Sequence, residues 1–452
     1  MRVLRGTVLL LLVLLAAAPA HANDLSDDLA ARRSRLMTRI GPDTMVVLFS
    51  APARVYSGDV NYEYHQDPNL YYLTGLDQEE TVVVLFPDSI REGFREIAFI
   101  RRTNDHLAVW EGPKFSKEEA QAVSGIEKVF WLDEMPNVLH DLILQAKRIY
   151  LNTEEYERFI PPFPTRNMRF ARLLMEQYPA HKYHRAQPIL KKLMMTKSAF
   201  EIELIQQAID ITGNAFQRVL QFVRPGVMEY EIEAEITHEF LMHGANGHAY
   251  EPIVASGPNT CILHYIKNNR SCQDQELLLL DFGAEYGNYT SDLTRTIPVN
   301  GRFTNRQKAV YNAVHRILEE AKPLLVPGTT LEDYQKEVAK MVESALIDLK
   351  VLSAKDIQQQ PADMPAYKKY FMHGVSHHLG LSVHDLSDRH APIQEGMVFT
   401  CEPGIYLREE GIGVRLENNI LVTDHGPLDL MSHIPIEAGE IEERMQQAKV
   451  LL

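Results

Sequence analysis

One arrangement of helix-forming and helix-breaking residues occurs twice in this chain. Each copy holds a helix that stops at a Pro-Gly pair, then a second helix, then sequence rich in strand-forming residues. The two pairs, Pro225-Gly226 and Pro327-Gly328, stand 102 positions apart (327 − 225). This recurrence predicts an internal duplication in which two helix pairs cover antiparallel strands. Pro-Gly is also a common helix break, so a chance recurrence stays the alternative.

Apolar spacing and capping residues predict where the duplicated helices begin and end. Ser198 and Glu201 form a capping box ahead of an apolar stripe with helical spacing, which stops before the first Pro-Gly pair. The other three helices are expected over residues 229–243, 305–325 and 331–347.

A separate domain is expected ahead of the duplication, because 452 residues suit two or three domains. We expect a mixed α/β domain over residues 23–190. Over residues 191–452 we expect an α+β domain that contains the duplication. Short β-branched runs bounded by turn residues indicate strands. In the first domain we expect strands over 45–51, 81–87 and 96–102, an aromatic-rich loop entering a strand over 62–76, and a helix over 166–178.

The first 22 residues have the features of a secretory signal peptide. Arg2 and Arg5 precede the apolar run VLLLLVLLAAA, which is short for a membrane span, and Ala20-His21-Ala22 is a small-x-small cleavage site. The sequence therefore predicts cleavage before Asn23 and export to the periplasm or beyond, with an uncleaved anchor as the alternative. Cleavage changes the net charge from −15 to −17 (−15 − 2), so neither nucleic acid nor an anionic membrane is expected as a partner.

The three cysteines, Cys261, Cys272 and Cys401, are too few for a disulfide framework. The sequence leaves a bond between Cys261 and Cys272 open. Cys401 has no nucleophile signature around it and is expected to be a small buried hydrophobe.

Two aspartates interrupt apolar, strand-like sequence. Four leucines precede Asp281, and the turn AEYGNY separates Asp281 from Asp292, so a hairpin would place both on neighbouring strands. Aspartate is depleted in strands and a buried unpaired carboxylate is costly, so a positive group must face them. A salt bridge to Arg295, or exposure at the hairpin end, would satisfy one aspartate. Two aspartates in apolar, strand-like sequence favour a metal site.

Two glutamates and a histidine extend this pattern. Glu402 follows the apolar run GMVFT. Glu417 shares one face of a strand expected over 411–423 with Arg415, and a surface Arg–Glu pair would explain that glutamate alone. His377 lies in FMHGVSHHLGLSVHD, which crowds four histidines into fifteen residues.

The charges of these residues balance with two divalent cations. Four carboxylates carry −4 and two divalent cations carry +4, whereas the same residues without metal would repel one another. Oxygen ligands with one imidazole suit manganese best, and zinc or cobalt less strongly. A carboxylate network without metal would leave the histidines unexplained. The predicted metal ligands are Asp281, Asp292, His377, Glu402 and Glu417.

These five residues stand in the order, and roughly at the spacing, of the ligands of the pita-bread metallopeptidases. The whole mature chain resembles the Xaa-Pro aminopeptidase (aminopeptidase P) family. YEYHQDPNLYYLTGLDQEE resembles the N-terminal domain of that family, which methionine aminopeptidases lack. SGPNTCILHY, LDFGAEYGNYTSDLTRT, HGVSHHLGLSVHD, EPGIY and GVRLENN resemble its catalytic motifs. The resemblance implies a pita-bread fold over residues 191–452 and a dimer or tetramer.

The resemblance also implies a role for each ligand. Asp292 and Glu417 would bridge two metals, and Asp281 would chelate one of them with both oxygens. His377 and Glu402 would complete the coordination, and Glu402 would also handle a proton of the attacking water.

Other residues near these ligands would act on the substrate. The resemblance implies contact with the substrate for three histidines and support of the ligands by one arginine: His264, His373, His384 and Arg415. His378 follows the ligand His377 directly and is expected to be packed or exposed, without a role.

The implied reaction is hydrolysis of the bond before a penultimate proline in peptides. That tertiary amide has no N–H and a constrained backbone, so ordinary aminopeptidases handle it poorly. A prolidase, which cuts only Xaa-Pro dipeptides, shares all five ligands and stays the alternative. Relatives with changed substrates, such as creatine, use similar residues. Pita-bread domains that only bind partners have lost ligands, whereas this chain keeps all five.

Overall fold

The computed structural model describes residues 18–153, 155, 160–361 and 364–450. It divides into two compact units, Met1–Met194 and Met195–Leu452; the sequence placed this boundary after residue 190. Most of the expected signal peptide lies outside the described residues, and residues 18–22 begin helix α1 (Ala18–Ile40). Among the described residues, no helix is long and apolar enough to cross a membrane.

The first unit is built on a mixed sheet. Its six strands lie in the order β6 (Lys128–Trp131), β5 (Glu96–Ile100), β4 (Val82–Leu85), β1 (Thr44–Phe49), β7 (Arg148–Leu151) and β8 (Lys182–Arg185). β4 pairs antiparallel with β1 and β5, and the outer strands pair in parallel. The strands expected over 45–51, 81–87 and 96–102 are β1, β4 and β5. A separate hairpin joins β2 (Val55–Ser57) to β3 (Val60–Asn61).

Helices complete the first unit. They are α1, α2 (Pro68–Thr74), α3 (Asp105–Glu111), α4 (Lys117–Ser124), α5 (Met135–Gln145), α6 (Arg166–Gln177) and α7 (Gln187–Met194), with a 3-10 turn η1 (Leu132–Glu134). The helix expected over 166–178 is α6. It begins after Thr165, whose side chain accepts a hydrogen bond from the Met168 N–H.

The loop expected at the start of residues 62–76 is present over residues 62–67, but the strand expected after it was wrong, because helix α2 stands there. Asp67 caps the helix by accepting hydrogen bonds from the backbone N–H groups of Asn69 and Leu70. Pro68 fits the first turn, where no N–H is needed, and Gly75 ends the helix at φ 64°. The caps outweigh the strand preference of the aromatic residues between them.

The second unit contains the two predicted helix pairs. The first pair is α8 (Ala199–Phe222) and α9 (Glu229–Met242), and the second is α10 (Asn305–Ala321) and α11 (Leu331–Asp348). The capping box of α8 forms as expected, with both Ser198 and Glu201 bonding the other's backbone N–H. Helix α10 ends earlier than expected, and a 3-10 turn η3 (Lys322–Leu324) follows, because Pro323 in that turn has no N–H to donate.

Short antiparallel strands follow each helix pair. One sheet has the order β10 (Ile253–Ser256), β11 (Leu277–Phe282), β14 (Leu293–Pro298), and another has the order β15 (Val398–Cys401), β18 (Asn418–Thr423), β19 (Gly426–Asp429). Smaller sheets join β13 (Tyr289–Thr290), β12 (Ala284–Tyr286) and β9 (Gly247–His248), and β16 (Gly404–Leu407) with β17 (Ile412–Arg415). The remaining described elements of this unit are α12 (Ala354–Gln359), α13 (Ala438–Val450), η2 (Gly257–Cys261), η4 (Ala366–Lys369) and η5 (Arg408–Glu410).

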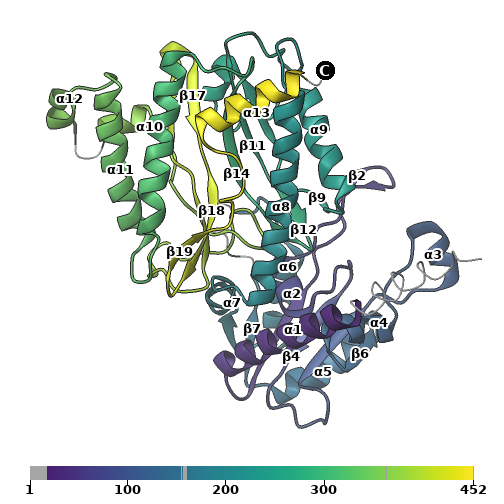
Figure 1. Cartoon of the computed structure of the whole chain (residues 1–452). Coiled ribbons are helices and arrows are strands. Elements are labelled where there is room, and N and C mark those ends of the chain that lie inside the picture. The colour runs from purple at the N-terminus through teal and green to yellow at the C-terminus, as the bar shows by residue number, and fades with distance from the viewer. Residues whose placement is uncertain (1–17, 154, 156–159, 362–363, 451–452) are drawn as a thin grey trace, which may run out of the picture. The chain divides into compact units, whose positions relative to one another are not determined.

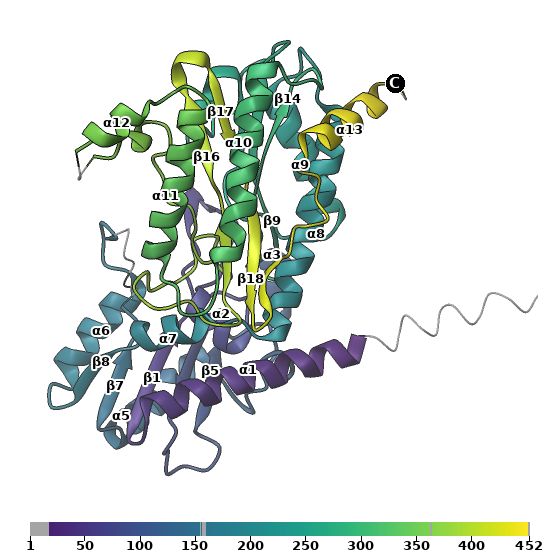
Figure 2. The same ribbon diagram turned by 60° about the vertical axis from the view of Figure 1, so that its left-hand side comes forward.

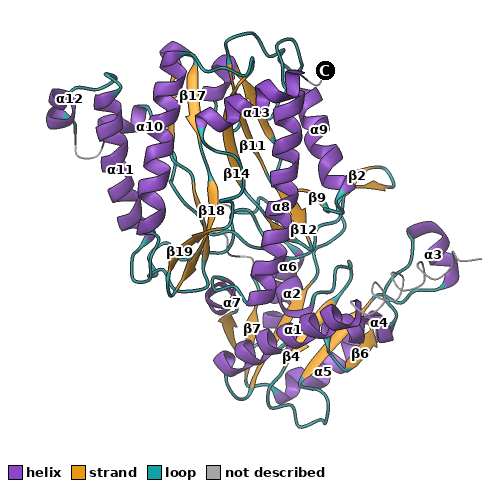
Figure 3. Ribbon diagram, viewed as in Figure 1, coloured by secondary structure: helices purple, strands orange, loops and turns teal. Residues whose placement is uncertain are grey.

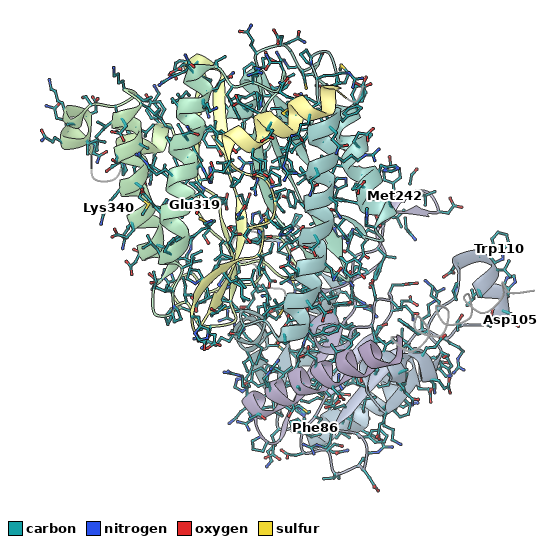
Figure 4. All side chains as sticks on the ribbon, in the orientation of Figure 1. Phe86, Asp105, Trp110, Met242, Glu319 and Lys340 are labelled. Atoms are coloured by element: carbon teal, nitrogen blue, oxygen red, sulfur yellow. The ribbon has the colours of Figure 1, made fainter. Side chains whose placement is uncertain are left out.

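This arrangement confirms the internal duplication. The two helix pairs lie on either side of strands β14 and β18 in Figure 1, and Figure 2 brings α10 and α11 forward. Strands occupy the interior of the unit and helices its outside (Figure 3). Charged residues such as Glu319 on α10 and Lys340 on α11 stay exposed (Figure 4). Helix α13 contacts both α8 and α10, and so connects the two halves.

The single strand expected over residues 411–423 is two strands, β17 and β18. They pair with different partners, β16 and β15. At the break, the Leu416 N–H donates to the Pro403 carbonyl (3.2 Å) and the Glu417 N–H donates to the Thr294 carbonyl (3.1 Å). The change of partner places Glu417 where the two halves of the unit meet.

All three cysteines are buried free thiols, so no disulfide joins Cys261 to Cys272. The Cys401 sulfur lies 3.1 Å from the Tyr334 hydroxyl, in a packed position as expected.

Candidate metal centre

Four carboxylates meet where the two halves of the second unit join. Asp281 lies on β11 and pairs in register with Thr294 on β14, and Asp292 immediately precedes β14. Glu402 follows β15, and Glu417 lies between β17 and β18. One ligand atom each from Asp292, His377 and Glu417 lies within 4.8 Å of the others.

His377 presents one ring nitrogen to these carboxylates. Its Nε2 lies 3.4 Å from Asp292 Oδ2 and 3.6 Å from Glu402 Oε1. Its Nδ1 lies 3.0 Å from the backbone carbonyl of His378, which only accepts hydrogen bonds. The carbonyl therefore fixes the proton of a neutral ring on Nδ1, and the lone pair of Nε2 is directed at the acids, as a metal ligand requires.

Tyr250 links the two aspartates. Its hydroxyl lies 2.7 Å from Asp281 Oδ1 and 2.5 Å from Asp292 Oδ1, and its one proton can serve either. Burial, reinforced by the charges of Asp281, Asp292 and Glu417, raises the pKa of Tyr250 well above its usual value. The hydroxyl therefore stays protonated and acts as a donor.

Arg415 holds Asp281 from the other side. Its guanidinium donates to Asp281 Oδ2 (2.5 Å), to the Tyr406 hydroxyl (2.9 Å) and to Thr294 Oγ1 (3.1 Å). Thr294 in turn donates to Glu417 Oε2 (2.6 Å). Burial opposes the charge of Arg415, but Tyr406, Asp281 and Glu417 outweigh it, so its pKa is raised and the cation persists. One buried cation thus orients two of the predicted ligands.

The residues fit a bound cation, because the described structure leaves one ligand oxygen unsatisfied. Glu417 Oε1 is buried and has no hydrogen-bond partner among the described residues. Burial first, and then the charges of Asp292, Glu402 and Asp281, raise the pKa of Glu417 well above its usual value. Burial likewise raises the pKa of Asp292 to about 6. A divalent cation among these oxygens would satisfy Glu417 Oε1 and remove the repulsion.

Glu402 differs from Asp292 and Glu417 because its pKa is lowered rather than raised. Burial opposes its charge, but a hydrogen bond from His373 and the charges of His377 and Arg415 lower its pKa to about 2. His373 Nδ1 lies 3.4 Å from Glu402 Oε2, and His373 Nε2 lies 2.8 Å from the Tyr406 hydroxyl. Glu402 is thus an anionic base beside an imidazole.

The other predicted site residues are placed as follows. The ring of His384 lies 4.4 Å from the ring of His377, measured between centroids. His264 is exposed in the turn after η2, and among the described residues no hydrogen bond joins it to the carboxylates. His378, for which no role was expected, is buried and packs on Phe399. His264 is therefore the one predicted residue that the contacts do not connect to this cluster.

Arg295 does not neutralise the aspartates, which was the alternative to a metal. Its guanidinium donates to the backbone carbonyls of Thr294, Pro435 and Glu417. Its hydrogen bonds therefore go to carbonyl oxygens rather than to the aspartates.

Several contributors were missed by the sequence reasoning. They are Tyr250, Thr294, Tyr406 and Asn419, whose side chain bonds both the N–H and the carbonyl of Asp292 (3.1 and 2.7 Å). Tyrosine and threonine close to apolar strands usually indicate packing, so no spacing signal separates these residues from core residues.

Comparison with known proteins places the chain in a family. Residues 203–424 match the model of metallopeptidase family M24, and residues 29–150 match the aminopeptidase P N-terminal domain. The Xaa-Pro aminopeptidase of Haemophilus influenzae is 33% identical over 426 residues, covering 92% of this chain and 96% of that protein.

Solved structures agree with this placement. Aminopeptidase PepP of Pseudomonas aeruginosa has a TM-score of 0.86 at 30% identity, covering 94% of this chain and 99% of that chain. Zn-substituted aminopeptidase P of E. coli in complex with product has a TM-score of 0.85 at 31% identity, covering 94% and 98%. The pita-bread fold and the family expected from the sequence are both confirmed. The chain belongs to metallopeptidase family M24 and is a metalloaminopeptidase that carries the N-terminal domain of aminopeptidase P.

Proposed function

We propose that this enzyme removes the N-terminal residue from peptides whose second residue is proline, and that it does so with two divalent cations. The observation that supports the proposal is that the five predicted ligands, drawn from both halves of one domain, come together in a chain similar to an Xaa-Pro aminopeptidase over 92% of its length. The proposed ligands are Asp281, Asp292, His377, Glu402 and Glu417.

Manganese is the proposed native metal. Four of the five proposed ligands offer carboxylate oxygens and one offers an imidazole nitrogen, a set that suits a hard or borderline cation. Zinc and cobalt fit the same set less strongly. When bound, such cations polarise a carbonyl and lower the pKa of a water.

The chain's own residues orient the substrate and move protons. Glu402, ionised beside His373, would accept a proton from the attacking water and return it to the leaving proline nitrogen. His373 and His384 would hold the peptide at the scissile bond, and His264 is proposed to reach it from its exposed turn. Arg415 would keep Asp281 and Glu417 in position through its three hydrogen bonds.

The test uses residues 23–452, stripped with a chelator and then supplied with manganese. We expect longer Xaa-Pro-Yaa peptides to lose one residue, as read by mass spectrometry, and cleavage to require the metal. An Asp292→Ala variant should abolish the reaction. Cleavage of Xaa-Pro dipeptides alone would make the enzyme a prolidase, and no cleavage of either, with metal bound, would refute proline specificity.

We also propose that residues 1–22 direct export and are removed, with the periplasm as the destination. The basic start, the apolar run and the Ala-His-Ala site support this proposal. N-terminal sequencing of the protein from separated cell fractions tests it, since Asn23 should come first in the exported fraction. A first residue of Met1 in that fraction would contradict it. A homodimer or homotetramer, and the lack of nucleic-acid or membrane partners, stay predictions.

A further inference from the structure

A buried ion pair in the second unit has no part in the site as described so far. Lys197 Nζ lies 2.8 Å from Asp385 Oδ2, and the two side chains are 1% and 2% exposed. The residues are 188 positions apart in the sequence. Burying two charges adds little net stability compared with apolar residues of the same size, so stability alone does not account for such a pair.

Asp385 closes the loop that carries His384 and starts directly after His377. It directly follows His384, and its N–H donates to the carbonyl of His378 (3.0 Å). Its Oδ1 is buried without a hydrogen-bond partner among the described residues, so the contact of Oδ2 with Lys197 compensates its charge. The loop so closed, residues 378–385, holds the ring of His384 4.4 Å from that of His377.

Lys197 approaches this loop from the chain just ahead of α8. Its backbone N–H donates to the Gly396 carbonyl (2.8 Å), which anchors it to the segment before β15. Its ammonium therefore reaches Asp385 from a segment outside the loop of residues 378–385.

Gly380 permits the close approach of the two charges. A Cβ at this position would lie 2.2 Å from Asp385 Oδ2 and 2.9 Å from Lys197 Cε. The Gly380 carbonyl also accepts hydrogen bonds from the backbone N–H and the hydroxyl of Thr290, both at 2.9 Å. Thr290 stands two residues ahead of Asp292. The ion pair therefore lies where the loop of residues 378–385 contacts the hairpin that carries Asp281 and Asp292.

We propose that Lys197 is a positioning residue, which acts through Asp385 to hold His384 against His377. The ion pair gives the loop one stable closure, because any other closure would leave the Asp385 carboxylate buried away from the Lys197 ammonium. The inference rests on the proposed function only for its kinetic test.

The kinetic test is a double-mutant cycle on the manganese-loaded enzyme with an Xaa-Pro-Yaa peptide. Lys197→Met should lower kcat/KM about 10- to 100-fold, as for partners that orient functional residues. Added to His384→Ala, it should cause no further loss, because the side chain it positions is already gone. Losses that multiply in the double variant would overturn the inference. If Lys197→Met does not fold, the same cycle is run with Lys197→Arg, which keeps the charge and should lose less.

Hydrogen exchange of the metal-free protein tests the inference without activity. Lys197→Met and Gly380→Ala should each speed amide exchange in residues 378–385 and leave β15 unchanged. Unchanged exchange in the loop would overturn the inference even if activity fell. Should the wild type cleave no Xaa-Pro peptide, the proposed function fails, and this measurement still decides the inference.

A control removes a more exposed ion pair elsewhere in the same unit. Lys308→Met breaks the contact of Lys308 with Glu442 (2.7 Å), which links α10 to α13. It should leave both the exchange of residues 378–385 and the value of kcat/KM unchanged. An equal effect of Lys308→Met would show that any lost ion pair loosens the loop, and would overturn the specific role of Lys197.

Discussion

A Glu417→Gln variant is expected to unfold at a higher temperature than the wild type when both are free of metal, and to lose at least about 100-fold in kcat/KM when metal is supplied. Glutamine keeps the shape of Glu417 and removes a carboxyl group whose ionisation is opposed by burial and by the charges of Asp292, Glu402 and Asp281. Its amide oxygen can still accept the hydrogen bond from Thr294, and its amide nitrogen can donate to the neighbouring acids. The same change removes the negative charge of a proposed metal ligand, so metal binding should weaken.

Thermal unfolding with a chelator and with manganese measures both effects. The control is Glu410→Gln, the same substitution at an exposed residue paired with Arg306 (2.7 Å). Its effect on stability should stay within about 0.5 kcal/mol, and its activity should match the wild type. A metal-free Glu417→Gln protein that is less stable than the wild type would show that this carboxylate is not destabilising in the empty protein.

The second large effect is a dependence of stability on pH that reverses with metal. In the metal-free protein, burial raises the pKa of Asp292 to about 6, above the value of about 4 in an unfolded chain. A carboxyl with a raised pKa contributes stability below its unfolded pKa, and that contribution is lost as pH rises through the folded value. A shift of this size corresponds to roughly 3 kcal/mol.

His377 changes stability in the same direction. Burial opposes its charge, but Asp292 and Glu402 outweigh it and raise its pKa to about 9, compared with about 6.5 in an unfolded chain. Its contribution is fully present below about pH 6.5 and is lost as pH rises toward 9. The pKa of Glu402 is lowered to about 2, so the stability that its ionised form contributes is lost only as pH falls toward that value. The metal-free protein should therefore become less stable from about pH 4 to about pH 9.

Bound metal should reverse this loss of stability with rising pH. The proposed ligands must be deprotonated to bind metal, so the affinity for metal and the stability that binding adds both increase with pH. Scanning calorimetry between about pH 5 and pH 8.5, with chelator or with manganese, should give melting temperatures that diverge as pH rises. Asp292→Asn should flatten the lower part of the metal-free curve. Parallel curves with and without metal would refute the account.

Much of the fold could be predicted because its signals are local. The Ser198 capping box and the Pro-Gly breaks depend on neighbouring residues, and they located the helix pairs to within a few positions. Helix α2 was missed although its caps are local too, because aromatic residues between Asp67 and Gly75 favour strands. The break between β17 and β18 had no local signal, since a change of strand partner is decided by distant chain.

The predicted ligands could be found because carboxylates are conspicuous in apolar strands. Their supporting partners could not, since Tyr250 and Thr294 look like ordinary packing until the segments meet. The Lys197–Asp385 pair could not be predicted for the same reason, because its two residues are 188 positions apart in the sequence. His264 is the opposite case. A sequence motif suggested its role, but its side chain is exposed and apart from the other predicted site residues.

The division of the predicted ligands between the two halves has a consequence for how the enzyme is made. Asp281 and Asp292 precede α10, whereas His377, Glu402 and Glu417 follow α11, and the first and last are 136 residues apart (417 − 281). A growing chain has no complete site until its second half is made and packed. A chain that ends before residue 377 lacks three of the predicted ligands, so we expect it to be inactive however much metal is supplied.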